Sequence, residues 1–181
     1  MNILLGVTGS VAATLTPRLV EGLRKRGDVQ VVASRSSLYF WKIADVPIRV
    51  WTEADEWQNA SYTRGQSIPH IDLREWADVL VIAPLSADTL AKLAHGRADN
   101  LLTCVVRAWD LQKPIVLAPA MNTLMWEHPA TEEHLATLRR WHGDRLRIVQ
   151  PIAKRLACGD EGIGAMALIP DIVNAVSLST T

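Results

Sequence analysis

Short apolar segments of strand length alternate with amphipathic segments of helix length along most of this chain, and this alternation limits the possible folds. The sequence predicts strands at 2–7, 29–33, 49–51, 79–83, 115–118 and 147–149. It predicts helices at 11–25, 37–43, 70–77, 86–95, 100–109 and 131–140, with a last helix near the C-terminus. Such alternation indicates a parallel sheet. We therefore expect an α/β fold in one domain over 1–181, a Rossmann-like (flavodoxin-like) doubly wound sheet with helices on both faces.

The composition excludes several classes of protein. The 19 basic residues balance the 19 acidic ones without forming a basic stripe, so we expect no nucleic-acid partner. The apolar runs are too short to span a membrane, and Met1 leads into a strand without a signal peptide. Cys104 and Cys158 are too few for a disulfide framework, which favours a cytoplasmic protein. The leucines and valines around Cys104 predict that it packs in the core.

Three of the predicted strands end in turns that carry glycine, serine or threonine: GVTGS at 6–10, SRSS at 34–37 and PLSADT at 84–89. The first turn lacks both the G-x-G-x-x-G spacing and the lysine of a P-loop, which leaves a mononucleotide phosphate or a simple tight turn. Each of the other two can be explained as a helix N-cap. Because all three would meet at the carboxyl edge of the sheet, we expect them together to hold a phosphate.

The segment PAMNTLM at 119–125 follows another apolar strand and presents a polar amide at the same edge. Asn122 carries donors and an acceptor without charge, so it can hold a carboxylate or an amide of a ligand. It can equally be the N-cap of a following helix. Both interpretations of Asn122 remain open at this point.

A histidine and a cysteine are further candidates for chemistry. His70 directly follows a polar segment without periodicity at 52–69, which we expect to be a long loop, and it can be either a proton carrier or a structural residue. The glycine-rich stretch at about 153–167 predicts a substrate flap. Within this stretch Cys158 is either a reactive thiol, favoured by Lys154 and Arg155, or an inert one. The histidines do not have metal-ligand spacing and there is no cysteine cluster, so we propose no metal site.

Several ordered motifs together resemble one family, the homo-oligomeric flavin-containing cysteine decarboxylases. They are HIDLR at 70–74, ADVLVIAPLSA at 77–87, DNLLTC at 99–104, RAWD at 107–110, PAMNTLMW at 119–126 and ACGD at 157–160. The similarity runs from the first strand to about Ala167. Two positions depart from the family pattern: Asp88 stands where asparagine is usual, and Leu168 stands where an acidic residue is common.

The resemblance implies bound FMN and a homotrimer, alone or as a dodecamer of trimers, with the flavin at a subunit interface. It implies catalytic roles for His70 as the active-site histidine and Cys158 as the acid of the flap. The implied substrate contacts are Asn122, Met125, Arg155, Leu156 and Ala157. The implied FMN contacts are Gly9, Ser10, Ser34, Ser36, Ser86, Thr89 and, near the ring system, Ala120.

The resemblance also implies the reaction. Flavin would oxidise the CH2–SH group of a cysteine to a thioaldehyde, whose C=S accepts the electrons left by departing CO2. The enethiol would then be reduced, with Cys158 donating the proton. The substrate would be 4'-phosphopantothenoylcysteine, giving 4'-phosphopantetheine for coenzyme A. The alternatives are a peptide that ends in cysteine, decarboxylated to an enethiol, or a non-catalytic flavoprotein that regulates a partner.

Overall fold

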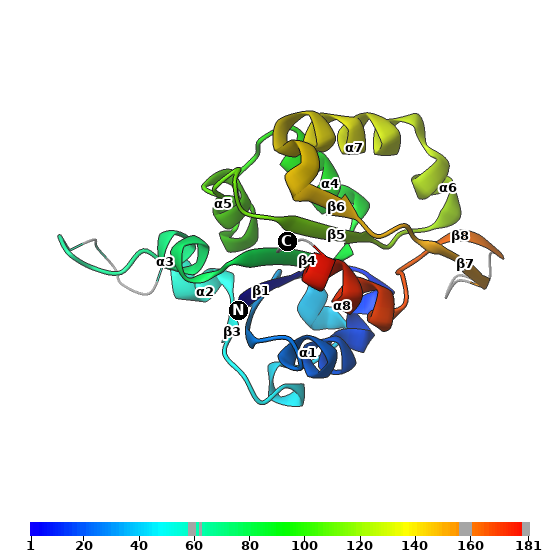
Figure 1. The fold of residues 1–181 in the computed structure, drawn as a ribbon. Coiled ribbons are helices and arrows are strands. Elements are labelled where there is room, and N and C mark those ends of the chain that lie inside the picture. The colour runs from blue at the N-terminus through cyan, green and yellow to red at the C-terminus, as the bar shows by residue number, and fades with distance from the viewer. Residues whose placement is uncertain (58–60, 62, 156–160, 179–181) are drawn as a thin grey trace.

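The core of the protein is a parallel six-stranded sheet with helices on both faces, seen in a computed structural model that describes residues 1–57, 61, 63–155 and 161–178 (Figure 1). The strands are β1 (Asn2–Val7), β2 (Asp28–Ala33), β3 (Val50–Trp51), β4 (Val79–Leu85), β5 (Ile115–Pro119) and β6 (Leu146–Ile148). Their order is β3-β2-β1-β4-β5-β6, and every neighbouring pair is parallel. This is the strand order of the Rossmann fold. The predicted fold class is confirmed.

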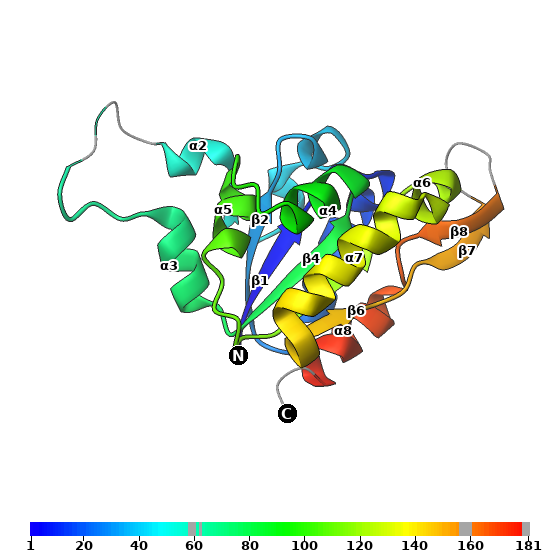
Figure 2. The same ribbon diagram turned by 90° about the horizontal axis from the view of Figure 1, so that it is seen from above.

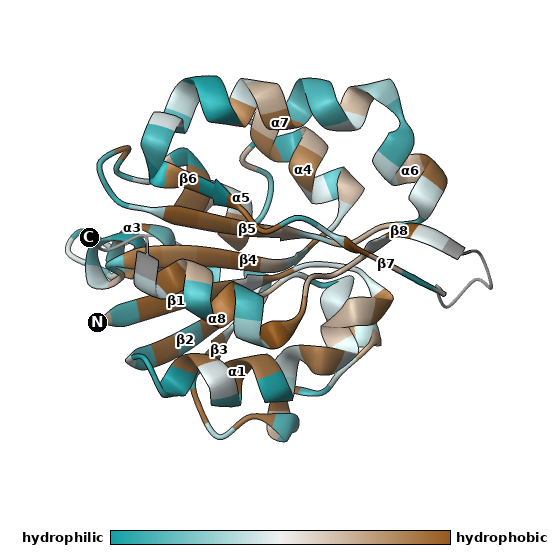
Figure 3. Ribbon diagram, turned by 45° about the vertical axis from the view of Figure 1, so that its right-hand side comes forward, coloured by the Kyte–Doolittle hydropathy of each residue, from teal (hydrophilic) through white to brown (hydrophobic). Residues whose placement is uncertain are grey.

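The central strands β1, β4 and β5 are largely apolar because helices cover both faces of the sheet, as in other parallel sheets (Figure 3). Residues Ile3 and Leu5 of β1 face α1 (Thr16–Arg24) and α8 (Ile169–Leu178). The intervening Leu4 faces the opposite layer, formed by α3 (Pro69–Trp76), α4 (Ala87–Ala94), α5 (Leu101–Arg107) and α7 (Pro129–His142). The alternation of side chains along a strand thus builds two cores from one apolar run.

Several short helical elements lie between the strands and the longer helices. They are the 3-10 helices η1 (Val11–Leu15), η2 (Ser37–Tyr39), η3 (Ile43–Asp45) and η4 (Gly143–Arg145), and the α-helices α2 (Glu53–Glu56) and α6 (Thr123–Glu127). No helix in the described part of the chain is both long and apolar enough to cross a membrane.

Two segments differ from the sequence prediction. The segment 52–69, expected to be a loop, contains α2, because Asp55 accepts hydrogen bonds from the backbone N–H and the hydroxyl of Thr52 at 2.7 and 2.9 Å and so caps the helix. The glycine-rich stretch at about 153–167 overlaps an antiparallel hairpin of β7 (Ile152–Arg155) and β8 (Glu161–Ala165), whose strands the sequence did not predict, while its role as a substrate flap stays a prediction.

Candidate cofactor and substrate site

Thr8 joins the turns that follow β1 and β4. Its side chain is fully buried, and its hydroxyl donates to the carbonyl of Pro84 at 2.8 Å and accepts from the backbone N–H of Ser86 at 2.8 Å. The backbone N–H of Thr8 also donates to Pro84 at 3.2 Å. These bonds fix two of the predicted phosphate-binding turns side by side at the carboxyl edge. The sequence analysis gave Thr8 no role, because its importance depends on β1 and β4 being neighbours.

The turn after β2 closes onto the turn after β1. The hydroxyls of Ser34 and Ser36 lie 3.2 Å apart in a hydrogen bond. A Cβ atom placed on Gly9 would lie 2.5 Å from the hydroxyl oxygen of Ser36, so only glycine allows this approach. On the other side of Gly9, Ser10 is the N-cap of η1 and accepts from the N–H of Ala12 at 3.3 Å. The predicted FMN contacts in the turns after β1 and β2 therefore lie in one cluster.

The turn after β4 presents two more hydroxyls. Ser86 is the N-cap of α4: its Oγ accepts from the N–H of Thr89 at 3.2 Å and donates to the Thr89 hydroxyl at 3.2 Å. The N-cap interpretation of Ser86 is confirmed, and its role toward a ligand stays a prediction. Asp88, which departs from the family pattern, forms an exposed ion pair with Lys92 at 3.2 Å.

The three turns fit the phosphate and the ribityl chain of FMN. They offer neutral hydroxyl groups, which can donate to phosphate oxygens and ribityl hydroxyls, next to helix starts whose backbone N–H groups favour an anion. The described residues contain no group of three or more His, Cys, Asp or Glu side chains placed to hold a metal ion. A small-molecule phosphate is the ligand that this chemistry suits.

The segment after β5 continues the same edge. Ala120 is buried, and its N–H donates to the carbonyl of Leu85 at the end of β4, at 2.9 Å. Asn122 is the N-cap of α6, with its Oδ1 accepting from the N–H of Leu124 at 2.8 Å. Met125 follows on α6 and is half exposed. The helix-cap interpretation of Asn122 is confirmed, while its contact with a substrate remains a prediction.

The hairpin of β7 and β8 packs onto the segment after β5. The N–H of Met121 donates to the carbonyl of Gly164 at 2.9 Å, and a Cβ atom on Gly162 would lie 2.6 Å from the hydroxyl of Thr123. Arg155 is the last residue of β7. The predicted site residues Leu156, Ala157 and Cys158 lie outside the described residues. The contacts of Gly162 and Gly164 fix the base of the predicted flap against the segment that holds Asn122.

His70 lies in the first turn of α3, where its Nδ1 forms a hydrogen bond with Oε1 of Glu56 on α2. The sequence analysis missed Glu56 because it treated 52–69 as a loop. The capping pattern of Thr52 and Asp55 is the signal that could have revealed α2, and with it a carboxylate close to the histidine.

Within one chain the structure does not bring His70 and Asn122 together. Helices α2 and α3 lie at one end of the molecule, whereas α6, β7 and β8 lie at the other, with the sheet between them (Figures 1 and 2). The predicted phosphate cluster lies at the carboxyl edge of the sheet. The phosphate cluster and Asn122 thus share the carboxyl edge of the sheet, whereas His70 lies at the opposite end of the molecule from Asn122.

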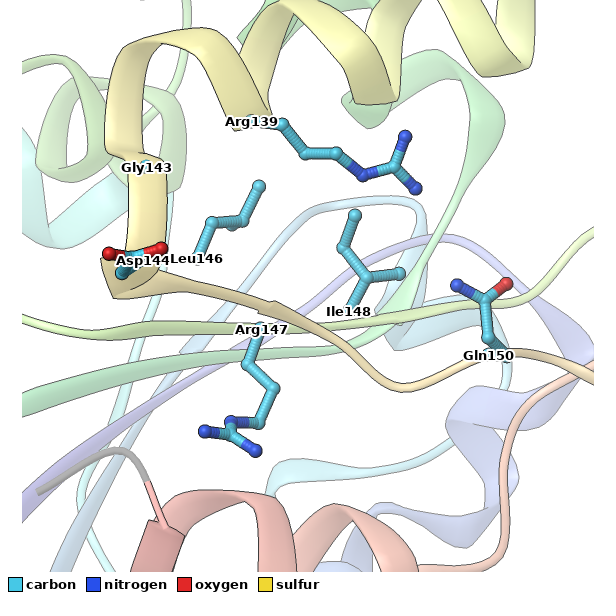
Figure 4. A pocket seen from close by; sticks show the side chains of 7 residues that line it. All are labelled: Arg139, Gly143, Asp144, Leu146, Arg147, Ile148 and Gln150. Carbon is cyan, nitrogen blue, oxygen red and sulfur yellow. The ribbon is translucent and has the colours of Figure 1, made fainter. Parts of the chain in front are cut away.

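An open cavity of about 670 Å3 lies along the edge strand β6 (Figure 4). Its lining carries side chains of both charges, Arg139 and Arg147 with Asp144. None of the residues predicted for the site lines it. The full lining is Arg139, Gly143, Asp144, Leu146, Arg147, Ile148 and Gln150.

Comparison with known proteins points to one family. The model of the family described as Flavoprotein matches residues 1–180. Phosphopantothenoylcysteine decarboxylase HAL3 of Malus domestica is 49% identical over 98% of this chain and 82% of its own length. Phosphopantothenoylcysteine decarboxylase of Mus musculus is 47% identical over 97% of this chain and 85% of its own length.

Solved structures that are similar to this chain point to the same family. A PPC decarboxylase mutant complexed with pantothenoylaminoethenethiol has a TM-score of 0.92 and 47% identity, covering 98% of this chain and 96% of that one. The FMN binding protein AtHal3 has a TM-score of 0.88 and 48% identity, covering 98% and 95% of the two chains. The peptidyl-cysteine decarboxylase EpiD is 23% identical with a TM-score of 0.76, over 97% of this chain and 98% of that one, and shares the fold.

Proposed function

Because the chain belongs to the Flavoprotein family, and its relatives at 47–49% identity are phosphopantothenoylcysteine decarboxylases, we propose that it is an FMN-dependent decarboxylase of 4'-phosphopantothenoylcysteine, with 4'-phosphopantetheine as the product. The observation that carries this proposal is a likeness over almost the whole chain to a decarboxylase holding pantothenoylaminoethenethiol, which contains an enethiol. The family predicted from the sequence motifs is confirmed.

FMN would be held by the three turns at the carboxyl edge of the sheet. The hydroxyls of Ser34, Ser36 and Ser86 would bind its phosphate and ribityl chain, with Gly9, Ser10 and Thr89 beside them. Ala120 would lie near the ring system, where a small buried side chain leaves room for a planar group. When bound, FMN supplies the two-electron oxidation of the cysteine CH2–SH group that makes loss of CO2 possible, and the return of those electrons.

The remaining residues would bind the substrate and move protons. Asn122, kept in place as the N-cap of α6, would hold the carboxylate end of the cysteine moiety, with Met125 and the flap residues Arg155, Leu156 and Ala157 around it. His70 would accept a proton from the substrate. Cys158 would donate the proton that completes the saturated thiol.

The site would be completed between copies of the chain. His70 belongs to α3 and Asn122 caps α6, and these helices lie at opposite ends of one molecule (Figure 2), so both residues would reach one flavin only if two copies contribute to it. A closed homotrimer, alone or in a dodecamer of trimers, would place the α3 end of one copy against the α6 end of the next, as head-to-tail interfaces do.

Mass spectrometry of the product tests this function. Wild-type protein loaded with FMN is expected to convert 4'-phosphopantothenoylcysteine to the saturated thiol with loss of CO2. A Cys158→Ser variant is expected to stop at the enethiol, because the proton donor of the last step is gone. Loss of CO2 only from a cysteine-ended peptide would reject the pantothenate substrate, and no loss of CO2 from either substrate would reject decarboxylation.

A further inference from the structure

We propose that Glu56 is a positioning residue for His70: its buried carboxylate holds the proton on Nδ1 and leaves Nε2 as the nitrogen that exchanges protons with the substrate. This inference rests on the proposed function for the identity of the reaction. The hydrogen bond itself does not depend on that function. It joins Glu56 on α2 to His70 on α3, two helices that are neighbours in the structure (Figure 1).

The donor and acceptor roles in this pair follow from the groups themselves. An ionised carboxylate can only accept a hydrogen bond, so Nδ1 of His70 must carry the proton in a bond to Glu56. In a neutral imidazole the other nitrogen, Nε2, is then an acceptor. The same arrangement, a carboxylate behind a histidine, fixes the tautomer in the Ser-His-Asp triad.

The surroundings of Glu56 point away from a purely structural role. Its side chain is 7% exposed, and its second oxygen, Oε2, is buried without a hydrogen-bond partner in the described part of the chain. Burying a carboxylate with one oxygen unpaired costs stability. Asp55, its neighbour on α2, shows the structural alternative: both of its oxygens are paired, with Thr52 and with Arg49 at 2.6 Å.

Two titratable groups that interact with Glu56 are His70 on α3 and Cys104 on α5. Burial and then the carboxylates of Glu56 and Asp99 raise the pKa of the Cys104 thiol on α5. Asp99 is itself paired with Lys92 and Arg97 at 3.4 and 2.8 Å. Cys104, expected to lie in the core, is only half buried, and its thiol donates weakly to a carbonyl at 3.7 Å. Among these groups His70 is the one that bonds Glu56 directly.

The position of α3 does not depend on Glu56. At the other end of the helix, the ammonium group of Lys113 donates to the carbonyls of Arg74 and Ala77 at 2.9 and 2.7 Å. Leu73 is buried in the core. A change at Glu56 should therefore alter the imidazole of His70 while leaving the helix that carries it in place.

The test is a Glu56→Gln substitution, which keeps the size of the side chain and removes its charge. We expect kcat to fall between about 10² and 10⁴-fold with little change in KM, because a glutamine amide can also donate to Nδ1 and so favours the wrong tautomer. Glu53→Gln, at an exposed position of the same helix, is the matched control and should retain wild-type activity. FMN absorbance should match wild type in both variants, because neither substitution touches the turns proposed to hold FMN.

Two further measurements separate positioning from structural support. In a His70→Asn background, Glu56→Gln should lower kcat/KM no further, because the two residues act as one unit. Nitrogen NMR of 15N-histidine-labelled protein, without FMN or substrate, should show the Nδ1–H tautomer of His70 in wild type and its loss in Glu56→Gln. An unchanged tautomer, or an unchanged kcat in an active enzyme, would overturn the proposal. A tautomer change in a protein that releases no CO2 would instead reject the proposed function.

Discussion

His142, near the end of α7, shows how a single buried group links stability to pH. Its side chain is 8% exposed, and its Nδ1 has no hydrogen-bond partner among the described residues. Burial lowers the pKa of this imidazole below its ordinary value of 6.5, because the protonated form is poorly solvated there. When the pH falls below 6.5, His142 therefore binds fewer protons in the native protein than in the unfolded chain. Stability from this residue is present above pH 6.5 and decreases as the pH falls toward the lowered pKa.

Replacing His142 with leucine should remove this dependence. We expect the free energy of unfolding of His142→Leu to fall less steeply than that of wild type when the pH is lowered from about 7 to about 5.5. Urea denaturation at several pH values measures the slope. Equal slopes for the two proteins would show that His142 does not titrate differently in the folded and unfolded states.

Single residues were predicted from the sequence with uneven success, and the reason is physical. Asn122 was recognised because a polar amide directly after an apolar strand is visible locally, and both of its possible roles followed from its chemistry. Thr8 and Glu56 were missed because each acts through a partner distant in the sequence, Pro84 for one and His70 for the other. Which hydroxyl or carboxylate becomes buried depends on the neighbouring elements, and local sequence does not show these.

At the scale of elements, the hairpin of β7 and β8 is held to the segment after β5 by backbone contact. Gly164 has a φ angle of +155°, which side chains rarely allow, and a Cβ atom there would collide with the carbonyl oxygen of Met121. The hydrogen bond from the N–H of Met121 to Gly164 depends on this approach. The base of the hairpin is therefore fixed next to the residues proposed to hold substrate.

A Gly164→Ala substitution should loosen the hairpin. We expect a loss of about 1–3 kcal/mol in the free energy of unfolding, from a strained backbone and displaced contacts. Ile163→Ala, at a partly exposed position of the same strand, should change it by no more than about 0.5 kcal/mol. Chemical denaturation measures both variants, and equal losses would mean that the glycine is not specifically required.

The elements that sequence analysis predicted best are those buried on both faces. β1, β4 and β5 are continuous apolar runs, and no other element of that length suits them between two helical layers. The hairpin was missed because Gly162 and Gly164 weaken the strand pattern, and α2 was missed because it is short and polar. Their conformations come from contacts with other elements rather than from their own periodicity.

At the scale of the whole molecule, the two ends of the sheet carry different parts of the proposed site. The pair of Glu56 and His70 lies with α2 and α3 at one end, while Asn122 and the β7–β8 hairpin lie at the other (Figure 2). The carboxyl edge of the sheet presents the hydroxyl turns that would hold FMN. In the proposed mechanism a second copy of the chain would bring its His70 to the flavin that lies beside Asn122, and this is the central claim of that mechanism.

Co-expression of two impaired variants tests that claim. His70→Asn removes the proton acceptor, and Asn122→Asp keeps the helix cap but repels the substrate carboxylate, so each variant alone should release CO2 from 4'-phosphopantothenoylcysteine at only a small fraction of the wild-type rate. In mixed oligomers about one quarter of the sites would combine an intact His70 with an intact Asn122 from two copies. We therefore expect CO2 release at about a quarter of the wild-type rate. Mixed oligomers that bind FMN but release no CO2, beside an active wild type, would contradict a site shared between copies.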